Sequence, residues 1–314
     1  MSLLRTAGLT KRYGGVTALD GLTVDVPRGL VGLVGANGAG KTTLFRLLLG
    51  LARPTEGTVE VCGRNVADDP VGSRARLGYM PEHDCLPLDQ SAADVVSTFG
   101  ELSGLPARAA RQRASEVLDL VGLDEARFRS VGGFSTGMRQ RVKLAQALVA
   151  DPELALLDEP TAGLDPTGRE EMLALVARLS SFGISVLLAT HLLDDVAKVC
   201  DHVVMLDAGR LVVAGPTETL LHQTGKLTVE VYAGVGRLAR ELMERGLTVV
   251  TDEPFELDGE GGSVDVVVGA DAGPVLDVIR DALADLALPL HRLSSRAASL
   301  DEAFTADRRP EGWQ

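Results

Sequence analysis

One glycine-rich octet constrains the fold of this chain more than any other feature. It reads Gly35-Ala36-Asn37-Gly38-Ala39-Gly40-Lys41-Thr42 and lies between the apolar run Leu30–Val34 and a helical pattern from Lys41 to Leu49. The pattern G-x-x-x-x-G-K-[ST] after a buried strand is typical of a phosphate-binding loop, in which glycines let the backbone wrap the phosphates. A chance glycine-rich loop is the alternative, but the strand before it and the helix after it favour phosphate binding.

The residues of this loop have separate expected roles. Lys41 would supply charge to the terminal phosphates, Thr42 would offer its hydroxyl to Mg²⁺, and Thr43 would reach the α-phosphate from the first helical turn. The remaining expected contacts to the phosphates are Gly35, Asn37, Gly38 and Gly40. The loop therefore predicts that a nucleotide binds together with Mg²⁺.

Further short apolar runs predict a buried parallel sheet. Leu154–Leu157 and Val186–Ala189 are continuous and are followed by polar segments, as in strands that are covered on both faces. Helical patterns separate these runs, for example at Gly137–Val149 and Arg169–Leu179. We therefore expect an α/β fold with a mostly parallel sheet and crossover helices over residues 1–222. The stretch from about 82 to 150 has no comparable strand and is expected to form an inserted helical subdomain.

The pattern changes after Gly215-Pro216 and a short helical segment that ends at Leu221. The expected elements are then a strand at 226–232, a helix at 235–245, strands near 247–257 and at 263–268, a helix at 275–286 and a strand at 289–293. Their order resembles a split βαβ unit. We expect a small α+β domain over residues 223–306, with a hairpin turn at 258–262, and a tail at 307–314.

Composition narrows the classes of function. The net charge of −13 and the pI near 4.9 argue against nucleic acid as a partner, because nucleic-acid binders usually carry a basic face. The 3 cysteines are far apart and odd in number, which fits a reducing compartment better than a disulfide framework or a metal site. No apolar run reaches the roughly 18 residues needed to cross a bilayer. We expect a soluble, cytoplasmic chain that reaches a membrane only through a partner.

Two carboxylates, Asp158 and Glu159, follow the run Leu154–Leu157. Beside a phosphate-binding loop, Asp158 is expected to hold Mg²⁺, and Glu159 to orient or deprotonate the water that attacks the γ-phosphate. An isolated Asp-Glu pair would more simply be a solvated strand end that caps the next helix. The combination with the loop favours the catalytic interpretation.

A second candidate anion site is Phe134-Ser135-Thr136-Gly137-Met138-Arg139-Gln140-Arg141, where a Ser-x-Gly turn opens an amphipathic helix. Backbone N–H groups and the helix dipole favour an anion at such a turn. The chain has a single loop of the Gly-Lys-Thr type for these two sites. This mismatch suggests that two copies of the chain share each nucleotide.

The ordered motifs resemble the nucleotide-binding subunit of ATP-binding cassette (ABC) transporters over about residues 3–222. The resemblance rests on the Ser135 turn, on Asp158-Glu159-Pro160-Thr161-Ala162-Gly163-Leu164-Asp165 and on Ala189-Thr190-His191. It implies a P-loop NTPase cassette that pairs head to tail, with each ATP between one subunit's phosphate loop and the other's Ser135 turn. Ser135 and Gly137 would then contact the γ-phosphate bound by the partner.

Further roles follow from the same resemblance. His191 would contact the γ-phosphate held by its own subunit, although a histidine at a strand end is often structural. Asp165 would lie in the loop that crosses the dimer interface, with capping of the next helix as the alternative role. Tyr13 would stack on adenine, whereas an aromatic residue in an early strand is usually part of the core.

Two positions depart from the usual family pattern. Thr136 stands where a glycine is common, so its backbone must avoid positive φ. Glu82 stands where a glutamine is usual. It could approach Mg²⁺, and its charge would add to carboxylate repulsion near Asp158 and Glu159. The alternative is that Glu82 is an exposed loop acid.

Glu82 and the Ser135 turn resemble the ABC-2 type branch that exports drugs, polysaccharides or lipids and includes daunorubicin-resistance ATPases. Ser299-Leu300-Asp301-Glu302-Ala303-Phe304 resembles the ending of these proteins, and its apolar face could serve core packing or a dimer contact. The resemblance implies an ATP-hydrolysing subunit that dimerises on binding ATP and powers export through a separate permease with about six membrane spans. Such a subunit is peripheral, on the inner face of the cell membrane.

Two other functions are alternatives. An importer subunit would more often carry glutamine at the Glu82 position and a larger β-rich tail. A soluble cassette ATPase without transport would usually show tandem cassettes or a long coiled-coil insertion, and this sequence shows neither.

Overall fold

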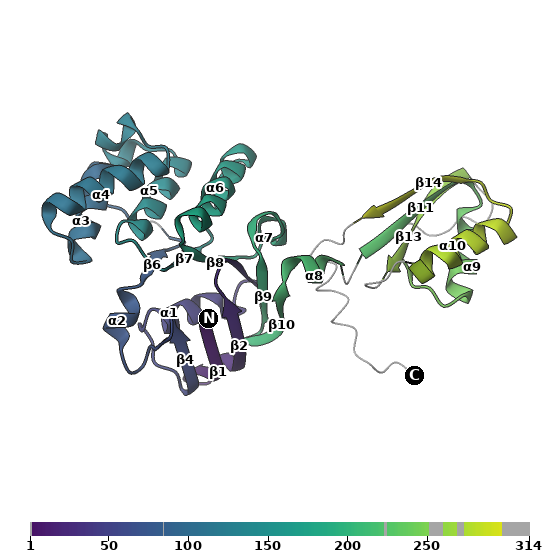
Figure 1. Cartoon of the computed structure of the whole chain (residues 1–314), viewed down its shortest axis with the longest axis horizontal. Coiled ribbons are helices and arrows are strands. Elements are labelled where there is room, and N and C mark those ends of the chain that lie inside the picture. The colour runs from purple at the N-terminus through teal and green to yellow at the C-terminus, as the bar shows by residue number, and fades with distance from the viewer. Residues whose placement is uncertain (1, 84, 223–224, 251–259, 269–272, 297–314) are drawn as a thin grey trace. The chain divides into compact units, whose positions relative to one another are not determined.

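The computed structural model of this chain describes residues 2–83, 85–222, 225–250, 260–268 and 273–296 (Figure 1). The chain divides into two compact units, Met1–Pro216 and Thr217–Gln314. Helix α8 (Thr217–His222) thus begins the second unit, whereas the sequence placed it at the end of the first. None of the helices in the described ranges is both long and apolar enough to cross a membrane.

A six-stranded sheet in the order β10-β9-β3-β8-β7-β6 forms the centre of the first unit. Its strands are β3 (Leu30–Val34), β6 (Leu77–Met80), β7 (Leu154–Asp158), β8 (Ser185–Thr190), β9 (His202–Asp207) and β10 (Arg210–Pro216). All neighbours pair in parallel except β9 and β10. Every residue of β3, β7 and β8 is buried, which explains the continuous apolar runs within these strands. The mostly parallel sheet predicted from the sequence is confirmed.

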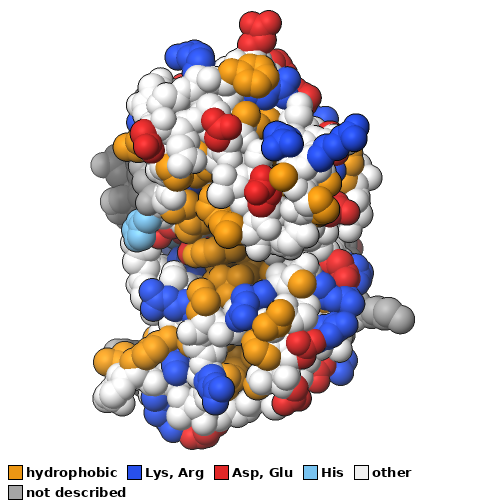
Figure 2. Space-filling view, turned by 90° about the vertical axis from the view of Figure 1, so that its left-hand side faces the viewer, with side chains coloured by type: hydrophobic (Ala, Val, Ile, Leu, Met, Phe, Trp, Pro, Cys, Tyr) orange, Lys and Arg blue, Asp and Glu red, His pale blue; other side chains and the backbone are white. Residues whose placement is uncertain are grey.

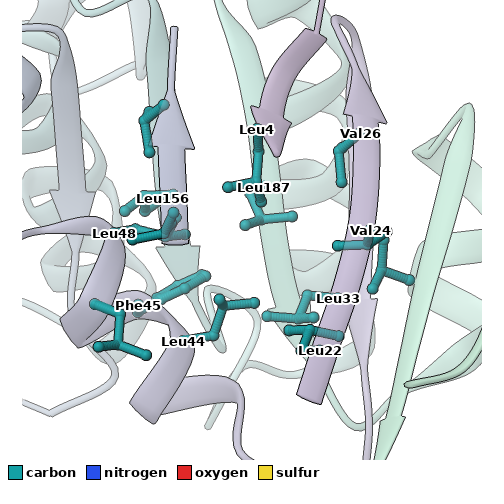
Figure 3. Packing of buried hydrophobic residues seen from close by; sticks show 14 of the residues in the cluster. Leu4, Leu22, Val24, Val26, Leu33, Leu44, Phe45, Leu48, Leu156 and Leu187 are labelled. Atoms are coloured by element: carbon teal, nitrogen blue, oxygen red, sulfur yellow. The ribbon is translucent and has the colours of Figure 1, made fainter. Parts of the chain in front are cut away.

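An antiparallel sheet in the order β2-β1-β4-β5 shares one core with the central sheet. Its strands are β1 (Ser2–Tyr13), β2 (Val16–Pro27), β4 (Glu56–Val61) and β5 (Arg64–Asn65). Figure 3 shows the side chains of α1 (Lys41–Leu48) within this core, together with those of both sheets. The labelled members are Leu4, Leu22, Val24, Val26, Leu33, Leu44, Phe45, Leu48, Leu156 and Leu187. This packing holds the start of α1, and with it the phosphate loop, against both sheets.

Helices complete the first unit. Outside the helical subdomain they are α2 (Pro70–Arg74), α6 (Pro166–Leu179), the 3₁₀ turn η3 (Ser180–Phe182) and α7 (Leu193–Val199). The helical subdomain comprises α3 (Ala92–Leu102), α4 (Ala107–Leu120), η1 (Glu125–Phe128), η2 (Val131–Gly133) and α5 (Thr136–Leu148). The described residues between 82 and 150 contain no strand, only an isolated bridge between Ser91 and Ser130. Figure 1 shows α3, α4 and α5 grouped together, and α5 packs against β6 and β7.

The second unit has its own sheet and core. Its elements after α8 are β11 (Gly225–Ala233), α9 (Val235–Glu244), β12 (Val249–Val250), β13 (Glu260–Val268), α10 (Gly273–Asp285) and β14 (Leu290–Arg296). The antiparallel order β12-β13-β11-β14 is that of a split βαβ unit. Val229, Leu238 and Ile279 are part of its buried core. The expected turn at 258–262 lies partly, and the Ser299–Phe304 segment wholly, outside the described residues.

Candidate active site

The octet Gly35–Thr42 forms the turn between β3 and α1. Gly38 and Gly40 have positive φ angles of 85° and 106°, which residues with a side chain rarely adopt. A Cβ at Gly40 would also lie 2.7 Å from the Leu19 side chain. The path of the loop therefore requires glycine. Because α1 begins at Lys41, the first amide groups of this helix have no partner within it and can meet an anion.

A pocket of about 140 Å³ opens at this loop. The predicted residues that line it are Asn37, Gly38, Gly40, Lys41, Thr42, Thr43, Glu82, Asp158 and Glu159. The fold thus joins the phosphate loop to both carboxylates after β7 and to the segment after β6. Gly35 is not among the residues that line the pocket, and a Cβ there would lie 2.5 Å from the Leu206 carbonyl oxygen, so close backbone packing requires a glycine at this position. Ala18, which the sequence did not indicate, lies in the wall.

Lys41 is folded back onto its own loop. Its Nζ donates to the carbonyl oxygens of Gly35 at 2.5 Å and Ala36 at 3.4 Å, and it lies 3.8 Å from Oε1 of Glu159. The ammonium is buried, so these contacts are what satisfy its charge. A phosphate group in the pocket would offer stronger acceptors than the two carbonyls.

Asp158, the last residue of β7, is buried among other acidic groups. Burial raises the pKa of its carboxyl to about 6, with further contributions from the charges of Glu82 and Glu159. The repulsion expected from Glu82 is therefore present in the structure. Burial, followed by the charge of Asp158, also raises the pKa of Tyr79 to about 12. Tyr79 therefore lies between Asp158 and the hydrophobic core, where its ring packs edge to face against that of Phe45.

Glu159 is held by several neighbours in a rare backbone conformation. Its φ is 47°, and its amide donates to the Ala189 carbonyl oxygen at 2.9 Å. Thr190 Oγ1 donates to Oε2 at 3.2 Å, and His191 Nδ1 lies 3.0 Å from Oε1. The histidine ring is half exposed, whereas the carboxylate is buried. The ends of β7 and β8 thus place His191 beside Glu159, and the start of α1 places Lys41 beside Glu159 as well.

The Ser135 turn faces a different space from the phosphate loop. Ser135 is the N-cap of α5, and its Oγ accepts from the Met138 amide at 3.3 Å. Thr136 lies in the helix, with negative φ as the sequence requires. Ser135, Thr136, Gly137 and Asp165 are among the residues that line a separate cavity of about 690 Å³. The chain therefore does not bring Ser135 and Gly137 to its own phosphate loop.

Two further predicted residues have well-defined surroundings. Asp165 caps α6: its Oδ1 accepts from the Gly168 amide at 2.9 Å, and Pro166 occupies the first helical position. Tyr13 lies at the end of β1 with 42% of its surface exposed, so it is not a core residue. The Lys11 ammonium lies 4.7 Å from the centre of the Tyr13 ring.

The sequence did not indicate Asp195, a buried acid that connects three segments of the site. Asp195 of α7 is only 1% exposed and accepts from Thr161 Oγ1 at 2.8 Å and from Arg169 Nε at 2.5 Å. These bonds join the segment after Glu159, the first turn of α6 and the helix after His191. An acid beside Asp194 in a helix looks like part of a solvated face, so periodicity alone gives little sign of it.

The fold and the pocket define a nucleotide-binding P-loop ATPase with an inserted helical subdomain. A family model for ABC transporters matches residues 19–162. A Nod factor export ATP-binding protein of Ralstonia nicotianae is 34% identical over 304 residues, covering 96% of this chain and 92% of that protein. A daunorubicin resistance ATP-binding protein of Streptomyces coeruleorubidus is 37% identical over 302 residues, covering 95% and 93%.

Solved structures agree with these relatives. The structure of an ATP-binding subunit of an ABC transporter is 31% identical, with a TM-score of 0.63, and the match covers 71% of this chain and 93% of that one. The chain therefore belongs to the ABC transporter family, as one of its ATP-binding ATPase proteins. The family and fold expected from the motifs are confirmed.

Proposed function

We propose that this chain is the ATP-hydrolysing subunit of an exporter, that ATP brings two copies together head to tail, and that the pair drives a separate membrane permease. One observation carries the proposal. Lys41 and Glu159 line one pocket, whereas Ser135 and Gly137 line a separate cavity of the same chain. A nucleotide can contact Lys41 and Glu159 of one chain together with Ser135 and Gly137 of another when two chains pair.

In the proposed reaction, water attacks the γ-phosphorus as the bond to the β–γ bridging oxygen breaks. Glu159 orients the water and accepts its proton, while Thr190 and His191 hold the carboxylate. Because His191 Nδ1 faces Glu159, Nε2 is the ring nitrogen left for the γ-phosphate. Lys41 would exchange its carbonyl acceptors for phosphate oxygens. Ser135 and Gly137 of the second copy would donate to the γ-phosphate from a helix N-terminus.

Mg²⁺ fits the acidic end of this pocket. Thr42, Asp158 and Glu82 would hold it, directly or through water, and the cation would neutralise charge on the phosphates. The crowding of Asp158 with Glu82 and Glu159, which contributes to its raised pKa, is relieved by a cation. The described residues contain no group of three or more acidic, histidine or cysteine side chains that could hold a metal. A site with only Asp158, Glu82 and the Thr42 hydroxyl still suits Mg²⁺, because this ion is usually held by one or two carboxylates and completes its coordination shell with phosphates and water.

The adenine and the dimer contacts have candidates outside the pocket. One face of the exposed Tyr13 ring has Lys11 above it, which leaves the other face for adenine. Asp165 lies with Ser135 in the wall of the larger cavity, where a second copy would arrive. Its capping bond to Gly168 fixes the loop in place for that contact.

A hydrophobic surface offers a place for the permease. Figure 2 shows apolar side chains gathered in a hollowed band across the middle of one face, with charged side chains above and below. The exposed large apolar residues of the first unit include Leu51, Val71 and Leu88. Contiguous exposed apolar surface of this kind marks interaction sites. We infer that a permease with about six spans covers it and holds the chain on the inner face of the cell membrane.

The direction of transport is inferred from the relatives. Those that match over nearly the whole chain are named for Nod factor export and for daunorubicin resistance. Glu82 and the small α+β second unit are the features of this chain that favour export over import. The permease that copurifies with the chain from membranes would test this directly: an exporter permease supports the proposal, and an importer permease contradicts it.

Hydrolysis itself is tested by replacing Glu159. We expect Glu159→Gln to lower the ATPase rate about 10³-fold and to trap an ATP-bound dimer, since the base is lost while binding is kept. The matched control is Glu170→Gln, which changes an exposed acid on α6 outside both cavities and should keep the wild-type rate. An unchanged rate in Glu159→Gln would rule out Glu159 as the base.

A further inference from the structure

Lys143 is a lysine buried in the interior of the first unit. It lies on α5, the helix that begins at the Ser135 turn, and only 1% of its surface is exposed. Its Nζ donates to the carbonyl oxygen of Glu82 at 2.8 Å and approaches that of His83 at 3.5 Å. Burial of an ammonium is costly unless acceptors replace its water. Two carbonyl oxygens of the segment that brings Glu82 into the ATP pocket are among its acceptors.

The bond from Lys143 fixes the position of the Glu82 backbone relative to α5. β6 ends at Met80, so no ladder of strand hydrogen bonds holds the backbone at Glu82. A charge-assisted bond from a buried donor is stronger than an ordinary one and specifies a single position of the carbonyl. The side chain of Glu82 lines the pocket beside Asp158. Lys143 thus acts on the pocket through the backbone of another residue.

A second bond from the same helix reaches the segment that follows Glu159. Gln140 is buried, and its Nε2 donates to the carbonyl oxygen of Ala162 at 3.1 Å. Ala162 follows closely after Glu159 in the loop that leads to Asp165. One helix therefore bonds to the backbone of the Glu82 segment and to the backbone of the segment after Glu159, while Ser135 caps its N-terminus.

We propose that Lys143 is a positioning residue that couples the Ser135 turn to Glu82. Lys143 is eight residues from Ser135 and so ~12 Å along the helix axis, within one unbroken helix. A shift of α5 moves Glu82 in the chain's own pocket because the helix and the Glu82 carbonyl are bonded. The part played by the second copy, whose nucleotide would move the Ser135 turn, rests on the proposed function. In a pair of chains, Lys143 then links each nucleotide to the other.

Hydrogen exchange of the nucleotide-free full chain tests the bond without any catalysis. Lys143→Met keeps the length and apolar volume of the side chain and removes the donor. We expect the amides around Glu82 and His83 to exchange about tenfold faster, as for the loss of one charge-assisted hydrogen bond. The matched control is Gln140→Met, which removes the other bond of α5 and should leave exchange at Glu82 unchanged. Unchanged exchange in Lys143→Met, or faster exchange spread evenly over the first unit, overturns the proposal.

Kinetics then test the coupling to Glu82. We expect Lys143→Met to lower kcat about tenfold with a change in KM for ATP of less than about threefold, and Lys143→Arg to restore most of kcat. In a Glu82→Ala background, Lys143→Met should lower kcat less than about twofold, because the side chain that Lys143 positions is already absent. Equal losses in both backgrounds overturn the coupling. If Lys143→Met does not fold, Lys143→Gln takes its place, since it stays polar but is too short to reach both carbonyls.

The two proposals can fail separately. A wild-type chain without ATPase activity contradicts the proposed function, whereas the exchange result at Glu82 still decides whether Lys143 holds that segment. Normal hydrolysis with additive losses in the Glu82→Ala background contradicts the role of Lys143 alone.

Discussion

His191 Nδ1 lies 3.0 Å from Oε1 of Glu159, and the two residues come from the ends of neighbouring parallel strands. Glu159 has φ of 47°, a conformation that costs a residue with a side chain on the order of 1 to 3 kcal/mol. The bonds from its amide to Ala189 and from Thr190 to its carboxylate maintain this conformation. It directs the carboxylate toward Lys41, 3.8 Å away. A strained backbone conformation that several neighbouring residues maintain beside a pocket is typical of a residue with a function.

The His191 ring should matter more for the chemical step than for binding. We predict that His191→Ala lowers kcat about 10²-fold while the affinity for ATP changes less than about threefold, because the phosphate loop remains intact. Steady-state kinetics with an ATP-binding titration would check this. His291→Ala, an exposed histidine of the second unit, is the control and should behave as wild type. A large loss of affinity with unchanged kcat contradicts the assignment.

Gly40 should not tolerate a side chain. Gly40→Ala would place a Cβ 2.7 Å from Leu19 at a φ of 106°, so we predict a loss of about 2 kcal/mol or more of unfolding free energy and no measurable ATP binding. Gly15→Ala is the matched control, because a Cβ there meets nothing within 4 Å and should cost less than about 1 kcal/mol. Denaturant unfolding and nucleotide titration measure both effects. Wild-type stability in Gly40→Ala would refute the account of this loop.

Asp195 should be a stability determinant, unlike its neighbour. Asp195→Ala leaves Arg169 and Thr161 without their buried acceptor, and we predict a loss of about 2 to 4 kcal/mol of unfolding free energy. Asp194→Ala removes an exposed acid from the same helix and should cost less than about 0.5 kcal/mol. Urea unfolding of the two variants compares them directly. Equal stabilities would show that the buried bonds contribute nothing.

Asp158 should lower the stability of the nucleotide-free protein at neutral pH. Its folded pKa of about 6 lies above the ordinary value of 3.8, so the folded state binds the proton more tightly than the unfolded state. Unfolding free energy is therefore lost as pH rises from about 4 to about 6, and the loss persists above that. We predict that Asp158→Asn recovers about 1 to 3 kcal/mol at pH ~7.5, allowing for partial solvation, and little below pH ~4. A gain of the same size at both pH values contradicts this.

Parts of the fold follow directly from the sequence. β3, β7 and β8 are covered on both faces, so most of their residues are apolar and the runs are easy to recognise. The antiparallel sheet was not predicted because one face of β1 is solvated and its pairing with β2 contains register shifts that break the alternation. In the second unit, buried and more exposed residues alternate more regularly along β11 and β13, and the expected order of strands and helices was correct.

The site divides in the same way. The pocket residues of the octet and the pair Asp158-Glu159 could be found because the chemistry requires these residue types next to one another. Lys143 and Asp195 could not, because each acts through a partner that is distant in sequence and each looks like one more charge on a helix. Their burial is a property of the tertiary structure.

Mixing two inactive variants tests the shared site most directly. Ser135→Arg blocks the turn that would meet the partner's nucleotide, and Lys41→Ala disables the phosphate loop. Each alone should be inactive. An equal mixture should recover about a quarter of the wild-type ATPase rate, because half of the random pairs combine both variants and keep one of two sites intact. Full activity of Ser135→Arg alone, or a mixture no more active than its components, would contradict a nucleotide site built from two chains.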